Sequence, residues 1–255
     1  MNLTFGISQV LRRLLPGGRH RRADLPRRQY KRGFYDDKEN LSERWGDIAP
    51  IVDLRPSDRV LDMGCAEGLI SFEVAKYVSH VDGVEINPHL LERAISEAVG
   101  KKVRNVSFTV GSVIDFRVSP KSYDIVLFLG VMGKRSGAKR VGLEELEQML
   151  LATRRQIIVR VNVQKRAYMQ DEKDEEDFRL DEILTLMDRQ EFDGICFSRR
   201  EGHGNLIVGN RRNSDARIRS ALPLVLVPTE MMRNHPCLRD VANLGPNNGD
   251  KHSAV

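Results

Sequence analysis

The stretch Val60-Leu61-Asp62-Met63-Gly64-Cys65-Ala66-Glu67-Gly68 decides the fold of this 255-residue chain. An apolar run ends beside an acid and is followed by two glycines, which is the pattern of a strand, a tight turn and the start of a helix. Glycine has no Cβ atom, so Gly64 and Gly68 let the backbone bend sharply and approach a ligand closely. The stretch therefore predicts a nucleotide-type binding turn.

A second run, Val81-Asp82-Gly83-Val84-Glu85-Ile86-Asn87, reads as a strand that ends in another acid. Glu85 lies 23 residues after Asp62. This is near the spacing at which such folds present a carboxylate to the hydroxyls of a ribose. The dinucleotide fingerprint G-x-G-x-x-G is absent, because Ala66 and Leu69 stand at the later glycine positions. The phosphate-binding pattern G-x-x-x-x-G-K-[ST] is also absent.

What remains, Asp62 to Gly68, resembles the first motif of class I S-adenosylmethionine-dependent methyltransferases, D/E-x-G-x-G-x-G, with Ala66 in place of the middle glycine. The resemblance extends over residues 58–210. It implies an α/β fold with a Rossmann-like, seven-stranded, mostly parallel sheet, helices on both faces and an antiparallel terminal strand. The implied strand order is 3-2-1-4-5-7-6, and the implied cofactor is S-adenosylmethionine.

Residue patterns predict the remaining elements. They indicate helices over 88–99 and 178–190, strands over 105–110 and 156–163, and a closing hairpin of 192–198 with 205–210. Tyr123 to Leu129 is almost continuously apolar, which is typical of a central strand buried on both faces. Strands that alternate with helices favour a parallel sheet.

The resemblance also assigns the cofactor residues. Asp62, Gly64 and Gly68 would surround the methionine portion, and Glu85 would bind the ribose. Family members often carry G-D-x-x-D after the third strand, where this chain has Ser112, so a hydroxyl would have to replace the acid that reaches adenine. The full predicted set is Asp62, Gly64, Cys65, Ala66, Gly68, Glu85, Ile86, Ser112, Val113 and Leu129.

The catalytic residues remain unknown, because methyl transfer from a sulfonium needs alignment and desolvation more than a base. The basic residues Lys134 and Arg135 follow the fourth strand and could face an anionic substrate, although a solvated loop is the simpler interpretation. Tyr35, Arg44 and Trp45 would flank the site if the segment 34–47 folds over it; simple packing is the alternative. The three cysteines show no metal-binding spacing, so no metal is expected.

The charge divides the chain into three predicted parts: an arm (1–34), a methyltransferase domain (35–212) and a flexible tail (213–255). The arm has nine basic side chains against one acid, a net +8, so the other 221 residues carry −3 of the chain's +5. Its apolar residues before Pro16 and the arginines that follow predict a peripheral anchor on an anionic membrane through residues 1–32. A disordered tail, an RNA tether and an organelle-targeting segment are the alternatives.

We therefore expect a cytoplasmic methyltransferase that is peripheral at the inner membrane face. We expect it to act on an O or N atom of a small or carrier-linked acceptor such as a glycan or lipid-linked sugar. DNA-adenine methylation is disfavoured, because the loop after Leu129 lacks N/D-P-P-Y. Two alternatives stay open. One is an RNA methyltransferase that uses the arm as a tether, and the other is a non-catalytic binding module with this fold.

Overall fold

The computed structural model describes residues 44–136, 138–161, 178–197 and 205–216. By internal contacts the chain divides into two units, residues 1–37 and 38–255. The first unit, with the predicted basic arm and Tyr35, lies outside the described residues. The predicted tail lies outside them beyond residue 216. The description below concerns the second unit alone.

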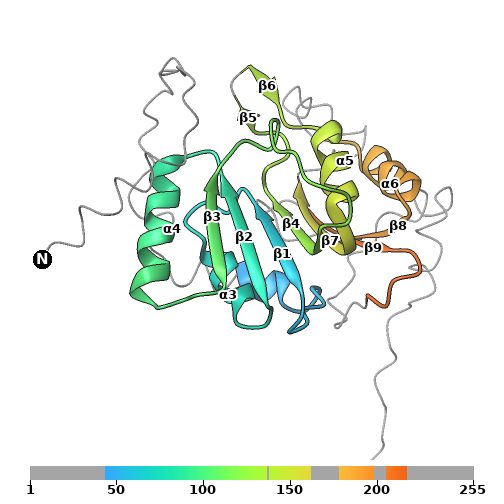
Figure 1. Cartoon of the computed structure of the whole chain (residues 1–255). Helices are drawn as coiled ribbons and strands as arrows, with labels where there is room; N and C mark the ends of the chain where they lie inside the picture. The colour runs from blue at the N-terminus through green and yellow to red at the C-terminus, as the bar shows by residue number, and fades with distance from the viewer. Residues whose placement is uncertain (1–43, 137, 162–177, 198–204, 217–255) are drawn as a thin grey trace, which may run out of the picture. The chain divides into compact units, whose positions relative to one another are not determined.

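Seven strands form one sheet in the order β3-β2-β1-β4-β7-β9-β8 (Figure 1). They are β1 (Arg59–Met63), β2 (His80–Glu85), β3 (Val106–Val110), β4 (Tyr123–Leu129), β7 (Thr153–Val161), β8 (Phe192–Phe197) and β9 (Asn205–Arg211). A separate two-stranded hairpin, β5 (Arg135–Ser136) with β6 (Lys139–Arg140), follows β4. When the seven strands of the sheet are numbered along the chain without β5 and β6, their order is 3-2-1-4-5-7-6, as predicted.

The strands β3, β2, β1, β4 and β7 pair in parallel, while β9 pairs antiparallel with both β7 and β8. The predicted α/β fold class, with an antiparallel strand last along the chain, is confirmed. Since parallel strands share one direction, the carboxyl ends of β1, β2, β3 and β4 meet at the same edge of the sheet. Ligands of open α/β sheets bind at that edge.

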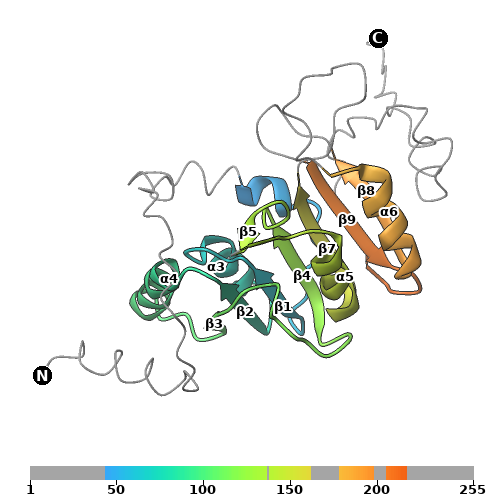
Figure 2. The same cartoon turned by 90° about the horizontal axis from the view of Figure 1, so that it is seen from above.

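Helices cover both faces of the sheet (Figure 2). The helices α3 (Leu69–Ala75) and α4 (Pro88–Gly100) and the helical residues 44–48 lie on one face; α5 (Leu143–Ala152) and α6 (Leu180–Arg189) lie on the other. Pro88 opens α4 as predicted, and Asn87 caps it, because its Oδ1 accepts a hydrogen bond from the backbone N–H of His89 at 3.0 Å. No helix in the described ranges is long and apolar enough to cross a membrane.

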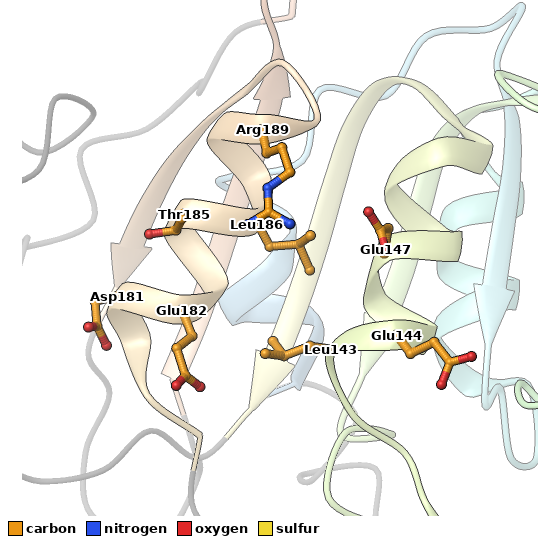
Figure 3. Close-up of a pocket in the computed structure, with 8 residues that line it drawn as sticks. All are labelled: Leu143, Glu144, Glu147, Asp181, Glu182, Thr185, Leu186 and Arg189. Atoms are coloured by element: carbon orange, nitrogen blue, oxygen red, sulfur yellow. The ribbon is translucent and has the colours of Figure 1, made fainter.

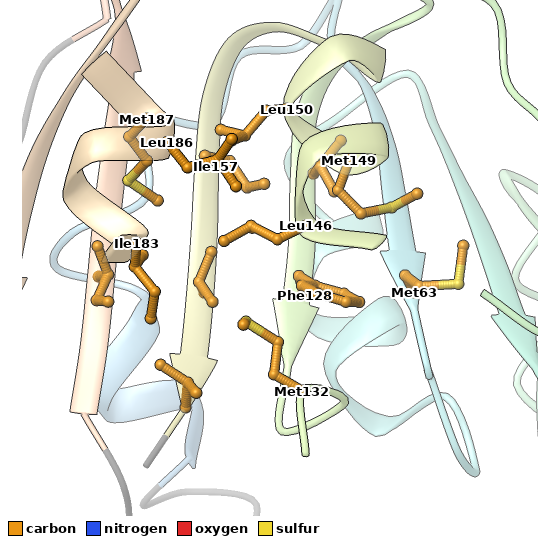
Figure 4. Close-up of a cluster of buried hydrophobic side chains, with 14 of the residues drawn as sticks. Met63, Phe128, Met132, Leu146, Met149, Leu150, Ile157, Ile183, Leu186 and Met187 are labelled. Atoms are coloured by element: carbon orange, nitrogen blue, oxygen red, sulfur yellow. The ribbon is translucent and has the colours of Figure 1, made fainter. Parts of the chain in front are cut away.

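Two apolar cores result from the alternation of side chains along the central strands. Val126 and Phe128 of β4 pack with α5 and α6 on one face. Figure 4 shows Phe128 in this methionine-rich cluster. Ile125 and Leu127 pack with α3 and Ile48 on the other. Each of these four β4 side chains has no solvent exposure. The prediction of a strand buried on both faces is therefore confirmed.

A buried charge network fixes the opposite, amino-terminal edge of the sheet. Arg155 of β7 is 6% exposed, and its guanidinium donates to Asp53 Oδ2 at 2.8 Å and to Asp58 Oδ2 at 2.5 Å. Arg55 joins Asp53 to Asp215 through hydrogen bonds of 2.9 and 2.6 Å. The network ties the segment before β1 to β7 and to the residues after β9.

The structure differs from the predicted elements in two places. The strand expected over 156–163 begins at Thr153, because Arg155 is buried in the charge network although its type suggests exposure. The helix α5 and the hairpin β5–β6 were not predicted at all. They occupy the stretch that the sequence presents as the loop after the fourth strand.

Candidate functional site

The turn between β1 and α3 is held against β2 by its own backbone. The N–H groups of Gly64 and Cys65 both donate to the carbonyl oxygen of Val84, at 2.7 and 3.1 Å. Gly64, Ala66 and Gly68 have φ values of +79°, +50° and +76°. Alanine in this left-handed region costs roughly 1 kcal/mol. The turn thus keeps a strained shape at the predicted cofactor motif, even where alanine replaces glycine.

Neighbouring side chains leave no room for larger residues at the two glycines. A Cβ atom on Gly64 would lie 2.5 Å from Cγ2 of Val131, in the loop after β4. One on Gly68 would lie 2.8 Å from Cζ of Phe108, on β3. The turn is therefore in direct contact with the loop after β4 and with β3. From the sequence, the two glycines were explained by the close approach of a ligand to the backbone. The structure adds a second reason, which is the packing of Val131 and Phe108 against them.

Glu85 ends β2 with its carboxylate under the turn. The side chain is 8% exposed, and its Oε2 accepts from the backbone N–H of Ala66 at 3.0 Å while Oε1 accepts from that of Asn87 at 2.9 Å. Each carboxylate oxygen can accept a second hydrogen bond, so the group can still receive the hydroxyls of a ribose. The next residue, Ile86, is 48% exposed and offers an apolar surface for an adenine ring.

Asp62 lies buried beneath the same turn. Its Oδ2 accepts a hydrogen bond from Ser71 Oγ of α3 at 2.6 Å, and the residue is 3% exposed. Burial raises the pKa of this carboxyl to about 6; the Glu85 charge raises it further, and the Ser71 hydrogen bond opposes both. A carboxylate so poorly solvated favours a cationic partner. The ammonium of a methionine moiety would supply that charge.

Cys65 also belongs to the turn, but it carries no thiolate chemistry. The residue is 7% exposed. Burial, followed by the charges of Asp62 and Glu85, raises the pKa of the thiol well above its usual range. The thiol therefore stays protonated and acts as a small apolar side chain.

Three further predicted cofactor residues, Ser112, Val113 and Leu129, lie just after β3 and at the end of β4. Ser112 Oγ forms a hydrogen bond with Ser136 Oγ of β5 at 2.8 Å and accepts from the backbone N–H of Ile114 at 3.2 Å. Val113 is buried in the core on the α5 side, and Leu129 packs against the core on the α3 side. The structure thus brings these residues to the predicted edge, while the Ser112 hydroxyl already has protein partners. A contact from Ser112 to adenine stays a prediction.

The predicted substrate residues divide into two groups. Lys134 and Arg135 are exposed at the start of the hairpin that follows β4. Arg44 and Trp45 lie in the helical segment 44–48, where the Trp45 ring stacks on Tyr77 with centroids 6.2 Å apart. Tyr77 comes just after α3, which leads away from the turn, so this stacking is a packing contact; substrate contact by Arg44 and Trp45 stays a prediction.

Sequence reasoning missed two charged pairs near this edge. Glu67 of the motif accepts from Arg93 of α4 at 2.5 Å, which joins the turn to the next helix. Arg160 of β7 lies 3.5 Å from Asp47 and is 14% exposed. For the first pair, the sequence offered a signal, because Glu67 is an acid inside the glycine motif. The second joins residues far apart in the chain and had no local signal.

A groove of about 530 Å³ runs between α5 and α6 (Figure 3). Its lining comes entirely from these two helices and includes the acids Glu144, Glu147, Asp181 and Glu182. Lys139 pairs with Glu144, and Arg179 pairs with Asp181. The groove is therefore separate from the strand ends that carry the cofactor motif. In the described part of the chain, no cluster of three or more His, Cys, Asp or Glu residues is placed to hold a metal ion.

A known protein family matches the part of the chain that holds this fold. Residues 54–197 match the family described as "Methyltransferase domain". A 23S rRNA (uracil(1939)-C(5))-methyltransferase RlmD of Legionella pneumophila is 38% identical over 65 residues, which is 26% of this chain and 15% of that protein. An uncharacterized methyltransferase of Schizosaccharomyces pombe is 37% identical over 82 residues, 29% of each chain. The chain thus spans a small part of these relatives.

A solved structure shares the fold over more of the chain. The PH0226 protein of Pyrococcus horikoshii superimposes with a TM-score of 0.52 at 18% identity, covering 69% of this chain and 93% of its own. The family match covers more than half of the chain, and the turn, Asp62 and Glu85 fit the cofactor implied by the motif. The chain therefore belongs to the methyltransferase domain family, as an S-adenosylmethionine-dependent member of the class I type.

Proposed function

We propose that the protein transfers a methyl group from S-adenosylmethionine to an O or N atom of a small or carrier-linked acceptor, such as a glycan or a lipid-linked sugar. The observation that carries the proposal is the pair of buried carboxylates around the glycine turn. Glu85 is 8% exposed and keeps acceptor capacity for a ribose, and Asp62 is 3% exposed and poised for an ammonium. Together they suit the two ends of one nucleoside-bearing sulfonium cofactor.

The chemistry asks little else of the chain. The cofactor supplies a methyl group with a good leaving group, and the protein must align the acceptor in line with it and exclude water. The turn is fixed by hydrogen bonds to Val84 and by contact with Val131, so it forms a rigid base for that alignment. A buried cysteine with a raised thiol pKa does not add a nucleophile. Direct transfer to O or N is the simplest reaction for these residues.

The basic composition of the arm and the RlmD relative favour RNA as a second candidate acceptor. The two candidates differ in the acceptor, so the decisive test is methyl incorporation from labelled S-adenosylmethionine into fractionated cell extract. Label in a small-molecule, glycan or lipid fraction supports the proposal. Label in RNA favours the second candidate. No label anywhere, with intact cofactor binding, would instead indicate a non-catalytic module.

Glu85→Ala should weaken binding of S-adenosylhomocysteine by roughly 5- to 150-fold, equivalent to about 1–3 kcal/mol, because the ribose hydroxyls lose their acceptor. Calorimetric titration of the folded variant measures this change. Glu97→Ala is the matched control, since Glu97 is an exposed acid of α4 paired with Lys101. Equal affinity in wild type and Glu85→Ala would remove Glu85 from the cofactor site.

We further propose that the protein works in the cytoplasm and that residues 1–32 attach it to the inner membrane face. Each basic residue near an anionic surface contributes roughly 1 kcal/mol, so a net charge of +8 is ample for reversible binding. Co-sedimentation should show binding to anionic vesicles, weaker binding in high salt and none to neutral vesicles. Deletion of residues 1–32 should abolish it. Retention of RNA but not of vesicles at the same salt would contradict the anchor.

A further inference from the structure

The loop after β4 brings two cations close to the cofactor turn. Val131 contacts Gly64 so closely that a Cβ on that glycine would lie 2.5 Å from its Cγ2. Lys134 follows three residues later, and its backbone N–H donates to the carbonyl oxygen of Val131 at 3.1 Å. Lys134 and Arg135 therefore begin one tight turn away from the residue that touches the glycine motif.

Backbone and side-chain hydrogen bonds hold this segment in place. Gly133 N–H donates to Val141 O at 2.9 Å, and Val141 N–H donates to Lys134 O at 2.9 Å. The next residue after Arg135, Ser136, is joined to Ser112 at 2.8 Å. The two cations thus project from a hairpin that is fixed at both the β4 and the β3 side of the site.

The four basic residues of this hairpin differ in their surroundings. Lys139 pairs with both Glu144 and Glu145 at 2.7 Å, and Arg140 lies over the Phe178 ring at 4.8 Å. Lys134 and Arg135 are exposed, and in the described part of the chain they make no ion pair or side-chain hydrogen bond. Both side chains can therefore donate charge-assisted hydrogen bonds to an oxyanion of a ligand.

We propose that Lys134 and Arg135 bind an anionic group, a phosphate or a carboxylate, of the methyl acceptor. The assignment rests on the proposed function and names its substrate class. A small or carrier-linked anion fits better than RNA, because a nucleic-acid surface needs basic side chains spread along the fold. Outside the arm the chain carries a net −3, and of the four basic residues of the hairpin only Lys134 and Arg135 are without an ion pair or ring contact in the described part of the chain.

The test uses the full-length protein saturated with S-adenosylhomocysteine, with inorganic phosphate as the probe. Phosphate should shift the NMR amide signals of residues 133–136 in a saturable way. Signals resolved by residue are required, because the nine basic side chains of the arm also attract phosphate. Lys134→Ala/Arg135→Ala should weaken this binding by at least about tenfold. Calorimetry with S-adenosylhomocysteine should show unchanged cofactor affinity.

The matched control is Lys101→Ala/Lys102→Ala, which removes the same charge from two exposed residues at the end of α4, at the opposite edge of the sheet. It should leave the phosphate response at 133–136 unchanged. If the protein binds the cofactor but shows no saturable phosphate shift, or if both double variants show an equal shift, the assignment of Lys134 and Arg135 is wrong, while the proposed function is unaffected. Failure to bind the cofactor would overturn the proposed function with it. Displacement of phosphate by a short RNA with a steep salt dependence would overturn the small acceptor and assign the pair to RNA.

Discussion

Arg155→Met should lower the free energy of unfolding by about 3–5 kcal/mol, because it leaves the buried Asp58 carboxylate without its cation. Asp53 loses one cation and keeps Arg55. Asp53 and Asp58 are each 3% exposed, and both accept hydrogen bonds from Arg155. Burial already raises the pKa of Asp58, and Arg155 opposes that rise. Removing the guanidinium raises the pKa of Asp58 further. The loss of unfolding free energy caused by Arg155→Met should therefore grow as the pH rises toward 7. Urea unfolding at several pH values measures it.

The neighbouring residue provides the control. Arg154 is 55% exposed and pairs with Asp124 at 2.6 Å, so Arg154→Met should cost less than about 1 kcal/mol. A triple variant, Asp53→Asn/Asp58→Asn/Arg155→Met, removes these charges together and should recover much of the loss. If Arg155→Met costs no more than Arg154→Met, the network does not hold the amino-terminal edge of the sheet.

The charge network around Arg155 could not be predicted from the sequence. Arg155 lies 102 residues from Asp53 and 97 from Asp58, so no local pattern connects them. The predicted strand began at Gln156, after this arginine, whereas β7 begins at Thr153. The stretch 123–129 was predictable for the opposite reason: its apolar side chains alone require burial on both faces.

The sequence contains a signal for the helix α5, although the helix was not among the predicted elements. It contains no such signal for the hairpin β5–β6. Leu146, Met149 and Leu150 have helical spacing, and the Glu145 carboxylate accepts from the backbone N–H of Gly142 at 2.8 Å in a capping arrangement. The strands of the hairpin have two residues each, too few for any periodicity. The hairpin is held by tertiary contacts such as the Ser112–Ser136 hydrogen bond.

The meeting of the motif residues at one edge of the sheet was the most predictable part, because they belong to two short motifs at the ends of neighbouring strands. Asp62, Gly64 and Glu85 come together at adjacent strand ends, since the strands that carry them pair in parallel. The order of the strands came from the family resemblance and not from periodicity. The substrate side stayed open, because methyl transfer requires position more than any particular catalytic group.

Asp62→Asn should make the protein more stable at pH 7 and less able to bind its cofactor. The carboxyl has a pKa of about 6 in the folded protein against 3.8 as its ordinary value. Below pH 3.8 it is neutral in both the folded and the unfolded chain; above pH 6 it is charged in both, and the folded state bears the cost of burying the charge. Between pH 3.8 and pH 6 the free energy of unfolding of the wild type should therefore fall by up to about 3 kcal/mol relative to that of Asp62→Asn.

The difference in unfolding free energy between wild type and variant, followed from pH 4 to pH 8 in urea, isolates this one carboxyl from the other titrating groups. Asparagine can still accept the Ser71 hydrogen bond, so packing under the turn is preserved. Asp115→Asn, at an exposed position in the loop after β3, should track the wild type throughout. A pH-independent difference, or a variant less stable than wild type at pH 7, would contradict the cost assigned to the buried charge.

Binding should follow the opposite trend from stability. An ionised Asp62 attracts the ammonium of S-adenosylhomocysteine, so wild-type affinity should fall as the pH drops below about 6, and Asp62→Asn should bind weakly at every pH. Calorimetric titrations across that range measure both trends. A carboxylate that destabilises the fold while improving ligand affinity is retained for binding. If Asp62→Asn keeps wild-type affinity, the charge has no role in holding the cofactor, and another explanation is needed for an acid buried beside Ser71.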